Sequence, residues 1–210
     1  MSKVTPVRID GGAGRDRAKA HRSKLVLASR SPRREQILRM LGVDFTVRTP
    51  DYEEINPPGM DPRRVPEHLA RGKAGSMAGL GPDTLVLGSD TVVLLGDRIL
   101  GKPQGAEGAL EMLTALNGRT HQVVTGVALA REGRILESGA ALTEVTFARL
   151  PPEALRAYAA SEEPMDKAGA YAIQGHGARL VEKVDGCFYN VMGLPIQLTL
   201  RMLGPYLHQE

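Results

Sequence analysis

The sequence is poor in cysteine and aromatic residues and has no long hydrophobic run, and each shortage argues against a class of protein. Its single cysteine, Cys187, cannot form an internal disulfide framework and is typical of a reducing compartment. Three Phe and five Tyr, with no Trp, provide no spaced aromatic platform for single-stranded nucleic acid. No apolar run approaches the roughly 20 residues of a membrane-spanning helix. The first 24 residues also lack the apolar core of a secretory signal, so we expect a cytoplasmic protein.

Several catalytic motifs are missing as well. The five histidines have no zinc-ligand spacing with Cys187, and there is no Gly-x-Ser-x-Gly nucleophile elbow. Residues 96–103 come close to the phosphate-loop pattern, but Pro103 replaces the Ser or Thr that would hold Mg²⁺. Cys187 is better explained as a small buried hydrophobic residue than as a nucleophile. These observations argue against zinc, serine-hydrolase and P-loop chemistry.

The length and charge distribution indicate one folded domain behind a basic tail. The 210 residues suit a single domain, or one domain with two lobes around a cleft. Residues 1–24 hold seven basic and two acidic residues, a balance of +5, while the remainder holds twenty and twenty-two, a balance of −2. We therefore predict a basic, disordered tail over residues 1–24 and a folded domain over residues 25–210. A nucleic-acid-binding arm or a misassigned start codon are the alternatives for the tail, and a transit peptide fits its composition less well.

Short apolar runs alternate with amphipathic segments along the rest of the chain, which predicts an α/β protein. Strands are expected at Leu25–Ala28, Phe45–Val47, Thr84–Leu95, Ile99–Leu100, Val123–Ala130, Ile135–Leu136, Thr143–Phe147, Leu180–Val184 and Phe188–Met192. Helices are expected at Pro32–Leu41, Pro66–Met77, Ala106–Leu116, Pro151–Ala160 and around Ile196–Leu203.

Two arginines stand in an unusual place at the start of the first predicted helix. Ser31 is a suitable N-cap and Pro32 a suitable first residue, but Arg33 and Arg34 follow directly. Each cation at the positive end of a helix dipole costs roughly 0.3–1 kcal/mol. Free backbone N–H groups, the dipole and two guanidinium groups together describe an anion pocket, with phosphate as the leading ligand. The alternative is a pair of solvated arginines.

Carboxylates and lysines elsewhere complete a set suited to a polyphosphate. Asp90 interrupts an apolar strand, where a carboxylate is costly unless it is paired or holds a metal. The cluster Asp51–Glu54 is either solvated loop charge or a source of a magnesium ligand, through one of its two glutamates. With Lys73 and Lys102, these residues fit metal-assisted chemistry on a polyphosphate. Gln174 has the donors and acceptor to read a base edge, although alone it is more simply a loop glutamine bonded to backbone.

Six motifs occur in order and carry a resemblance to a known family. They are Leu-Ala-Ser-Arg-Ser-Pro-Arg-Arg (27–34), Gly-Ser-Asp-Thr-Val-Val (88–93), Gly-Lys-Pro (101–103), Leu-Asn-Gly-Arg-Thr-His (116–121), Asp-Lys-Ala-Gly-Ala-Tyr-Ala-Ile-Gln-Gly (166–175) and Val-Met-Gly-Leu-Pro (191–195). Over about Leu25–Leu203 the chain resembles the Maf-like nucleoside triphosphate pyrophosphatases. The resemblance implies an α/β fold of two lobes, with a mixed sheet, flanking helices and a central nucleotide cleft like that of the inosine triphosphatases. It also implies a divalent cation, Mg²⁺ or Mn²⁺, and suggests a homodimer.

The resemblance implies hydrolysis of a nucleoside triphosphate to the monophosphate and pyrophosphate. Asp90 would be the base that activates water, and Glu53 would help it to hold the metal, which leaves the main role of Asp90 open. Phosphates would be held by Arg34, Lys73 and Lys102, and Ser29 of the first motif would also contact the substrate. The subgroup that acts on dTTP and UTP is marked by three residues that this sequence matches with Arg33, Thr91 and Gln174. Pyrimidine triphosphates, including modified ones, are therefore the expected substrates.

The tail and Arg30 depart from the family pattern. Residues 1–24 have no counterpart in it, and Arg30 stands where a smaller or neutral residue is usual. The alternative function is a non-catalytic nucleotide- or nucleic-acid-binding regulator of cell division, with the tail as its anchor. Within the enzyme class, the alternative is a preference for a different triphosphate. Neither a membrane nor a nucleic acid is the expected partner.

Overall fold

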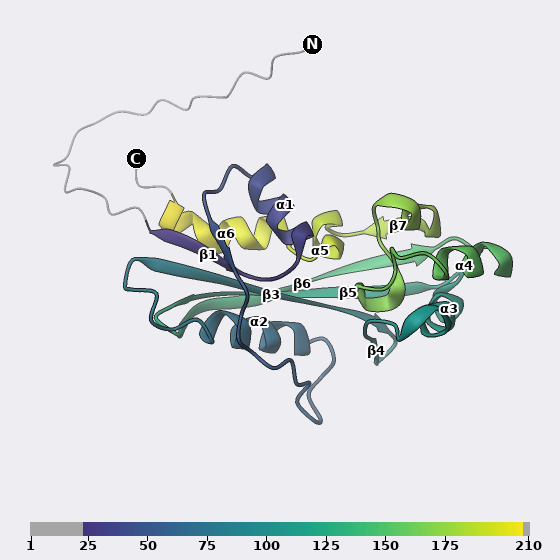
Figure 1. Ribbon diagram of the computed structural model, residues 1–210, viewed down its shortest axis with the longest axis horizontal. Coiled ribbons are helices and arrows are strands. Elements are labelled where there is room, and N and C mark those ends of the chain that lie inside the picture. The colour runs from purple at the N-terminus through teal and green to yellow at the C-terminus, as the bar shows by residue number, and fades with distance from the viewer. Residues whose placement is uncertain (1–22, 208–210) are drawn as a thin grey trace, which may run out of the picture.

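The structure, a computed structural model, describes residues 23–207 and is built on one mixed sheet (Figure 1). Its seven strands are β1 (Lys24–Ala28), β2 (Thr46–Arg48), β3 (Thr84–Leu95), β4 (Arg98–Leu100), β5 (Thr120–Arg131), β6 (Arg134–Phe147) and β7 (Val181–Asp185). They lie in the order β2-β1-β3-β5-β6-β7, with β4 paired to the end of β3. β1 runs parallel to β2 and β3, and the other pairs are antiparallel.

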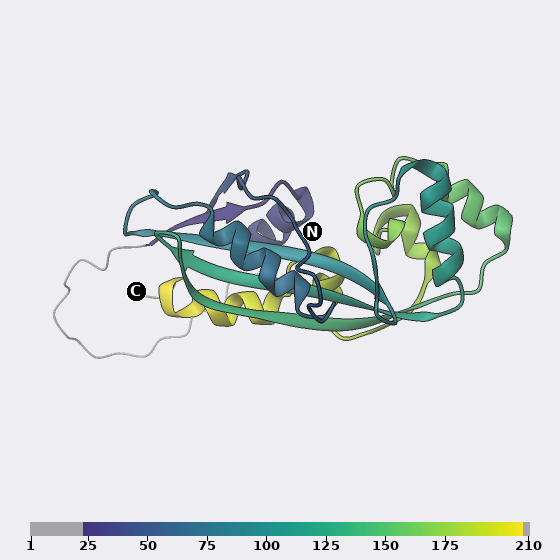
Figure 2. The same cartoon turned by 90° about the horizontal axis from the view of Figure 1, so that it is seen from below.

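Helices cover both faces of this sheet and form two lobes. In the first lobe, α2 (Val65–Gly75) lies on one face, and α1 (Pro32–Met40), α5 (Phe188–Met192) and α6 (Ile196–Leu207) lie on the other. The second lobe lies at the far end of the strands (Figure 2). It contains α3 (Gly105–Leu116), α4 (Pro152–Ala159) and the 3₁₀ turns η1 (Ala168–Ala170) and η2 (Gly175–Leu180). The predicted α/β architecture of a mixed sheet with flanking helices is confirmed.

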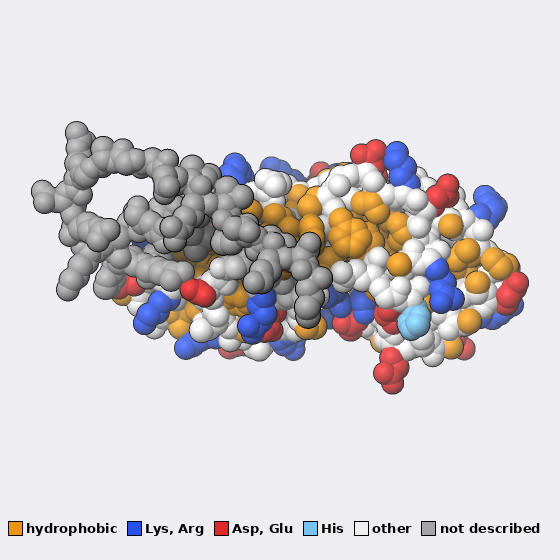
Figure 3. All heavy atoms as spheres, turned by 90° about the horizontal axis from the view of Figure 1, so that it is seen from above, with side chains coloured by type: hydrophobic (Ala, Val, Ile, Leu, Met, Phe, Trp, Pro, Cys, Tyr) orange, Lys and Arg blue, Asp and Glu red, His pale blue; other side chains and the backbone are white. Residues whose placement is uncertain are grey.

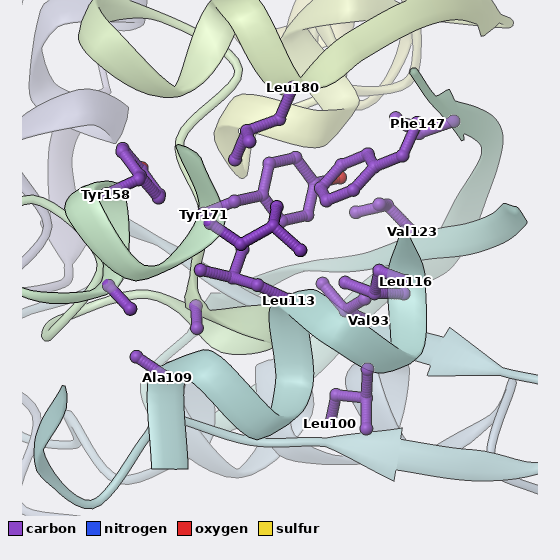
Figure 4. Close-up of a cluster of buried hydrophobic side chains, with 14 residues drawn as sticks. Val93, Leu100, Ala109, Leu113, Leu116, Val123, Phe147, Tyr158, Tyr171 and Leu180 are labelled. Carbon is purple, nitrogen blue, oxygen red and sulfur yellow. The ribbon is translucent and has the colours of Figure 1, made fainter. Parts of the chain in front are cut away.

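The long strands β3, β5 and β6 pass through both lobes and contribute to two separate cores. Leu85 and Leu87 of β3 belong to the core of the first lobe, which α1 and α6 complete. Val93, further along β3, packs in the second lobe among residues of α3 and α4. Figure 4 shows this second core, where Tyr171 and Phe147 meet edge to face with ring centroids 4.8 Å apart. The polar middle of β3 lies between the two cores.

Two glycines allow α2 to lie directly on the sheet. A Cβ at Gly88 of β3 would overlap the backbone of α2 at Ala70 and Ala74, and one at Gly126 of β5 would overlap the start of the helix at Pro66. The helix face in contact is itself built of small residues, because Ala70 and Ala74 are fully buried. This close approach of backbones brings the charged side of α2 to the middle of β3.

The prediction of a strand at Phe188–Met192 is wrong, since this segment is the single-turn helix α5. Four of its five residues are apolar or aromatic, and so short a segment fits a strand or one helical turn equally well by periodicity. Gly193, with φ of +107°, ends the helix in the left-handed region that favours glycine. Strand β6 also differs, because one continuous strand replaces the two short ones expected at Ile135–Leu136 and Thr143–Phe147.

The first helix begins as predicted but is capped differently. Ser31 is the N-cap residue of α1, yet its side chain makes no capping hydrogen bond. Its backbone N–H donates instead to Ser29 Oγ at 3.0 Å, which tightens the turn after β1. The predicted tail lies outside the described residues except for Ser23 and Lys24, and Lys24 already belongs to β1.

Where it is not covered by the residues drawn in grey, this side of the molecule is apolar in its middle and has charged side chains toward its edges (Figure 3). Phe188 of α5 is 39% exposed and Leu200 of α6 is 36% exposed, both large hydrophobic side chains. The homodimer that the family resemblance suggests stays a prediction.

No helix within residues 23–207 has the length and apolar character to cross a bilayer.

Candidate active site

A cleft of about 580 Å³ lies between the lobes, at the middle of β3. Its wall combines the turn before α1, the loop before α2, the end of β4 and the segment around η1. Six Lys or Arg residues and three Asp or Glu residues line it. Since the basic groups outnumber the acidic ones two to one, the cleft favours an anion of high charge.

A cluster of one lysine and two carboxylates forms the floor of the cleft, in which Lys73 and Asp90 are buried and the Glu54 side chain is 49% exposed. Asp90 is 6% exposed and Lys73, on α2, is also 6% exposed. Lys73 Nζ lies 2.6 Å from Asp90 Oδ1 and 2.8 Å from Glu54 Oε1. The close packing of α2 on Gly88 places Lys73 here. A charge buried in this way is stable only when it is paired, and Lys73 and Asp90 satisfy this requirement for each other.

The two carboxyl groups have pKa values shifted in opposite directions. Burial raises the pKa of Asp90, against the opposing charges of Lys73 and Arg34, and the nearby charge of Glu54 adds to the rise. Burial acts on Glu54 as well, but the hydrogen bond and charge of Lys73 outweigh it and lower the pKa of Glu54. Such a divided pair is typical of acid–base sites, and the carboxyl group with the raised pKa suits the role of base.

The structure places Glu54, not Glu53, in the cleft. Glu54 Oε1 lies 2.8 Å from Lys73 Nζ, and the N–H of Ile55 donates to the Glu53 carbonyl oxygen at 3.0 Å, so the backbone turns at Glu54. Glu53 is exposed and does not belong to the cleft wall. The structure therefore does not bring Glu53 to Asp90, as the predicted metal site requires, and Glu54 is the glutamate that lines the cleft. The loop is positioned by Tyr52, whose ring lies directly against Gly72 of α2, where a Cβ would overlap it.

Arg34 points into the cleft from α1 and is held by three hydrogen bonds. Its Nε donates to the carbonyl oxygen of Gly193 at 2.8 Å, its Nη2 to Thr91 Oγ1 at 3.1 Å and its Nη1 to Ser29 Oγ at 3.4 Å. A Cβ at Gly193 would lie 3.2 Å from Arg34 Nε, so glycine allows this approach. Burial lowers the pKa of Arg34, yet a guanidinium stays charged at neutral pH. Two of its five N–H donors remain to meet a phosphate.

Arg33 reaches across the cleft to the second lobe. Its Nη1 lies 3.2 Å from Asp166 Oδ2, and Lys167 Nζ lies 2.6 Å from the other oxygen of Asp166. The pair is largely exposed, so it contributes little to stability. It nevertheless shows that the two arginines of the first helical turn diverge, Arg34 toward the floor of the cleft and Arg33 toward its far wall.

Lys102 and Gln174 line the cleft from the side of the second lobe. Lys102 is exposed at the end of β4, and its charge helps to lower the pKa of Glu54. Gln174 precedes η2 in a loop that the Glu163 carboxylate fixes. The two carboxylate oxygens of Glu163 accept the N–H groups of His176 at 3.0 Å and Gly177 at 2.8 Å. The side chain of Gln174 is exposed, and these hydrogen bonds fix the backbone that follows it.

The donor set on the cleft floor fits a hard divalent cation. The oxygens of Asp90 and Glu54 both contact one ammonium group, so they are close enough to share a single cation. Mg²⁺ is typically bound by one or two carboxylates together with substrate phosphates and water. Within residues 23–207 no group of three or more His, Cys, Asp and Glu side chains converges.

The structure brings most residues predicted for the site to one cleft. Those that line it are Ser29, Arg33, Arg34, Lys73, Asp90, Thr91, Lys102 and Gln174. Sequence reasoning did not single out Lys167, Asp166 or Tyr52, which line it too. The adjacent opposite charges of Asp166 and Lys167, just before a glycine, were the available signal. Nothing in the pattern around Tyr52 indicated that its ring would cover a helix.

The fold and site define an α/β protein with a cleft rich in Lys and Arg, and comparison with known proteins identifies its family. The model of the Maf-like protein family matches residues 24–205, and the chain belongs to that family. Similar proteins include one from Myxococcus xanthus, 48% identical over 88% of this chain and 93% of its own. Others are from Moorella thermoacetica (47%, covering 87% and 94%) and Bacillus velezensis (43%, covering 87% and 96%). All three are named dTTP/UTP pyrophosphatase.

Solved structures show weaker similarity. A HAM1 protein from Coxiella burnetii is 24% identical with a TM-score of 0.41, covering 61% of this chain and 75% of that one. A nucleoside-triphosphatase, described as a dITP/XTP pyrophosphatase, from Mycobacterium abscessus is 17% identical with a TM-score of 0.40, covering 88% and 97%. At these TM-scores the site has to be interpreted from its own geometry.

Proposed function

We propose that this protein is a nucleoside triphosphate pyrophosphatase that hydrolyses dTTP and UTP to the monophosphate and pyrophosphate. The observation that carries the proposal is the Asp90–Lys73–Glu54 cluster on the floor of a cleft rich in Lys and Arg. It joins a base to cations that can bind a triphosphate. The relatives named dTTP/UTP pyrophosphatase, 43–48% identical over nearly the whole folded part, support the same activity.

The side chains divide the reaction between them. Asp90, with its raised pKa, accepts a proton from the water that attacks the α-phosphorus. The bond between this phosphorus and the bridging oxygen breaks, and pyrophosphate leaves with that oxygen. Arg34 and Lys102 neutralise charge on the phosphates, and Lys73 keeps Asp90 in place through its 2.6 Å contact. Such groups are most effective when they are fixed before the substrate arrives, as Arg34 is by its three hydrogen bonds.

Asp90 and Glu54 would hold the divalent cation, Mg²⁺ or Mn²⁺. A bound cation of this kind would neutralise phosphate charge and polarise the phosphoryl oxygens. Because Lys73 contacts both carboxylates in the structure, its ammonium group and a metal compete for the same oxygens.

Arg33, Thr91 and Gln174 are the residues proposed to favour a pyrimidine base. They come from α1, β3 and the loop before η2, and all three line the cleft. Gln174 offers a donor and an acceptor side by side, as the edge of uracil or thymine requires. We further propose the cytoplasm as its compartment, since Cys187 is free and no other cysteine is present.

A pyrophosphate-release screen tests the proposal directly. Purified protein with Mg²⁺ is offered the common ribo- and deoxyribonucleoside triphosphates and modified pyrimidine triphosphates, and we expect the highest kcat/KM for dTTP and UTP. Asp90→Asn should lower kcat by about a hundredfold or more, the usual scale of general-base catalysis. Asp185→Asn, at a 69% exposed carboxylate on β7, is the matched control and should retain wild-type turnover. Wild-type rates in Asp90→Asn, or no pyrophosphate release from any triphosphate, would refute the assignment.

A further inference from the structure

A chain of hydrogen bonds runs from the cleft into the protein interior behind Thr91. Arg34 Nη2 donates to Thr91 Oγ1, which lies 2.9 Å from Thr125 Oγ1. Thr125 Oγ1 in turn lies 2.8 Å from the backbone oxygen of Asn190 in α5. The two threonines are direct partners in the register of β3 and β5. Thr125 is fully buried and is not part of the cleft wall, so it cannot contact a ligand there itself.

The proton positions along this chain follow from the acceptors at its end. A threonine hydroxyl carries one proton, and a backbone carbonyl oxygen can only accept. The Thr125 proton therefore points to the Asn190 oxygen, since two oxygens 2.8 Å apart without a proton between them would repel. Thr125 must then accept the proton of Thr91. Toward Arg34 and the cleft, Thr91 consequently presents lone pairs alone.

We propose that Thr125 is a positioning residue, which orients the Thr91 hydroxyl as an acceptor and thereby fixes Arg34 for triphosphate binding. Without the Thr125 hydroxyl, the Thr91 proton loses its acceptor and is free to turn toward Arg34, where it would oppose an N–H donor. The Asn190 oxygen would still accept the N–H of Gly193 at 3.0 Å, so no buried carbonyl is left without a partner. The role is thus separable from the stability of the fold.

The test compares Thr125→Val, which removes the hydroxyl at similar volume, with Thr125→Ser, which keeps it. Losing one hydrogen bond that orders a binding group should raise the KM for dTTP and UTP in Thr125→Val about five- to tenfold. Thr125→Ser should stay within about twofold of wild type, because its hydroxyl can restore the chain. Thermal unfolding identifies loss of fold. A folded Thr125→Val with unchanged KM, or a Thr125→Ser as impaired as Thr125→Val, would overturn the proposal.

The route through Thr91 is tested in a double variant. Because Thr125 acts on Arg34 only by way of the Thr91 hydroxyl, Thr125→Val should change KM little in a Thr91→Val background. If the two substitutions instead multiply their separate effects on KM, Thr125 acts by another route and the proposal is wrong.

The kinetic test rests on the proposed function, whereas a binding measurement does not. Titration of wild type, Thr125→Val and Thr125→Ser with a non-hydrolysable dTTP analogue and Mg²⁺ reports the same positioning effect as an affinity. We expect Thr125→Val to bind about five- to tenfold more weakly and Thr125→Ser to match wild type. Absence of pyrophosphate release from wild type would refute the proposed function alone. Equal affinity in all three proteins would refute the role of Thr125.

Discussion

At the scale of single residues, the proposed base Asp90 and its pairing with Lys73 predict how the reaction depends on pH. Asp90 must be unprotonated to act as a base, and burial has raised its pKa above the ordinary aspartic acid value. The acidic limb of the kcat/KM profile should therefore begin at a higher pH than an exposed aspartic acid would give. Lys73 opposes the rise through its charge. In Lys73→Met that opposition is lost, so the pKa of Asp90 rises further.

We therefore expect the acidic limb of Lys73→Met to move to higher pH than that of wild type, in addition to a lower rate. The measurement is kcat/KM for pyrophosphate release against pH at a Mg²⁺ concentration below saturation, because a cation bound to Asp90 would itself lower the pKa of that carboxyl group. Circular dichroism confirms folding at each pH. An acidic limb that stays in place or moves to lower pH in Lys73→Met would show that another group limits the rate.

The same scale shows what sequence could and could not determine about the site. Asp90, Arg34 and Lys102 were predictable because each is unusual for its local structure or belongs to a motif. Asp90, a carboxylate in an apolar strand, is the clearest case. The choice between Glu53 and Glu54 was not, because the side that a loop residue faces depends on what the loop packs against. Thr125 gave no signal at all, since threonine in a strand is ordinary and its role depends on a partner from α5.

At the scale of elements, two glycines of α2 have different roles. A Cβ at Gly72 would overlap the ring of Tyr52, whereas one at Gly75 would make only ordinary contacts at 3.4 Å and beyond. Gly72→Ala should therefore displace the Tyr52 ring, which positions the loop that carries Glu54, and lower kcat/KM about tenfold or more, as small displacements in active sites commonly do. Pyrophosphate release measured side by side in the two alanine variants tests this.

Gly75→Ala is the matched control in the same helix. It should retain wild-type activity and raise the free energy of unfolding by up to about 1 kcal/mol, since alanine is the better helix former. Full activity in Gly72→Ala would mean that the Tyr52 loop does not need this contact.

Whether a segment is a helix or a strand was predictable where its hydrophobic pattern extended over many residues, and uncertain where the pattern was short. The twelve residues of β3 form the strand that their apolar run predicts. The five residues of α5 do not, because their conformation is decided by Gly193 and by the buried Asn190 amide, which donates to the Val123 carbonyl at 2.9 Å. Contacts of this kind join strands and helices that are distant in sequence, so the local sequence pattern does not predict them.

At the scale of the whole molecule, His121 ties stability to pH. It is 2% exposed in the core of the second lobe, and burial lowers its pKa to about 4 from an ordinary value of 6.5. Between pH 4 and pH 6.5, His121 therefore binds a proton in the unfolded chain but not in the folded chain. The free energy of unfolding consequently falls as the pH falls below 6.5. The shift corresponds to about 3 kcal/mol lost by pH 4.

Urea unfolding of wild type and His121→Gln at pH 7 and at pH 4 measures this contribution. We expect the wild type to lose more of its free energy of unfolding between the two pH values than the variant does. Subtracting the loss in the variant from the loss in wild type gives the contribution of His121, because the carboxylates titrate in both proteins and cancel. Equal losses in both would assign the acid sensitivity to other groups.

The passage of β3, β5 and β6 through both lobes limits how the cleft can open. Two halves joined by a flexible linker can swing apart about a few backbone torsions, but these halves share long ladders of interstrand hydrogen bonds. The β3–β5 ladder keeps one register throughout, and the β5–β6 ladder shifts only between Leu129 and Ala130. Opening must therefore occur as a change in sheet twist that is spread over many residues. Each residue changes its backbone torsions only slightly, and the sheet as a whole deforms elastically. Product release from such a cleft would depend on the stiffness of the sheet itself, so a substitution in the middle of β6, remote from every reacting atom, can alter turnover.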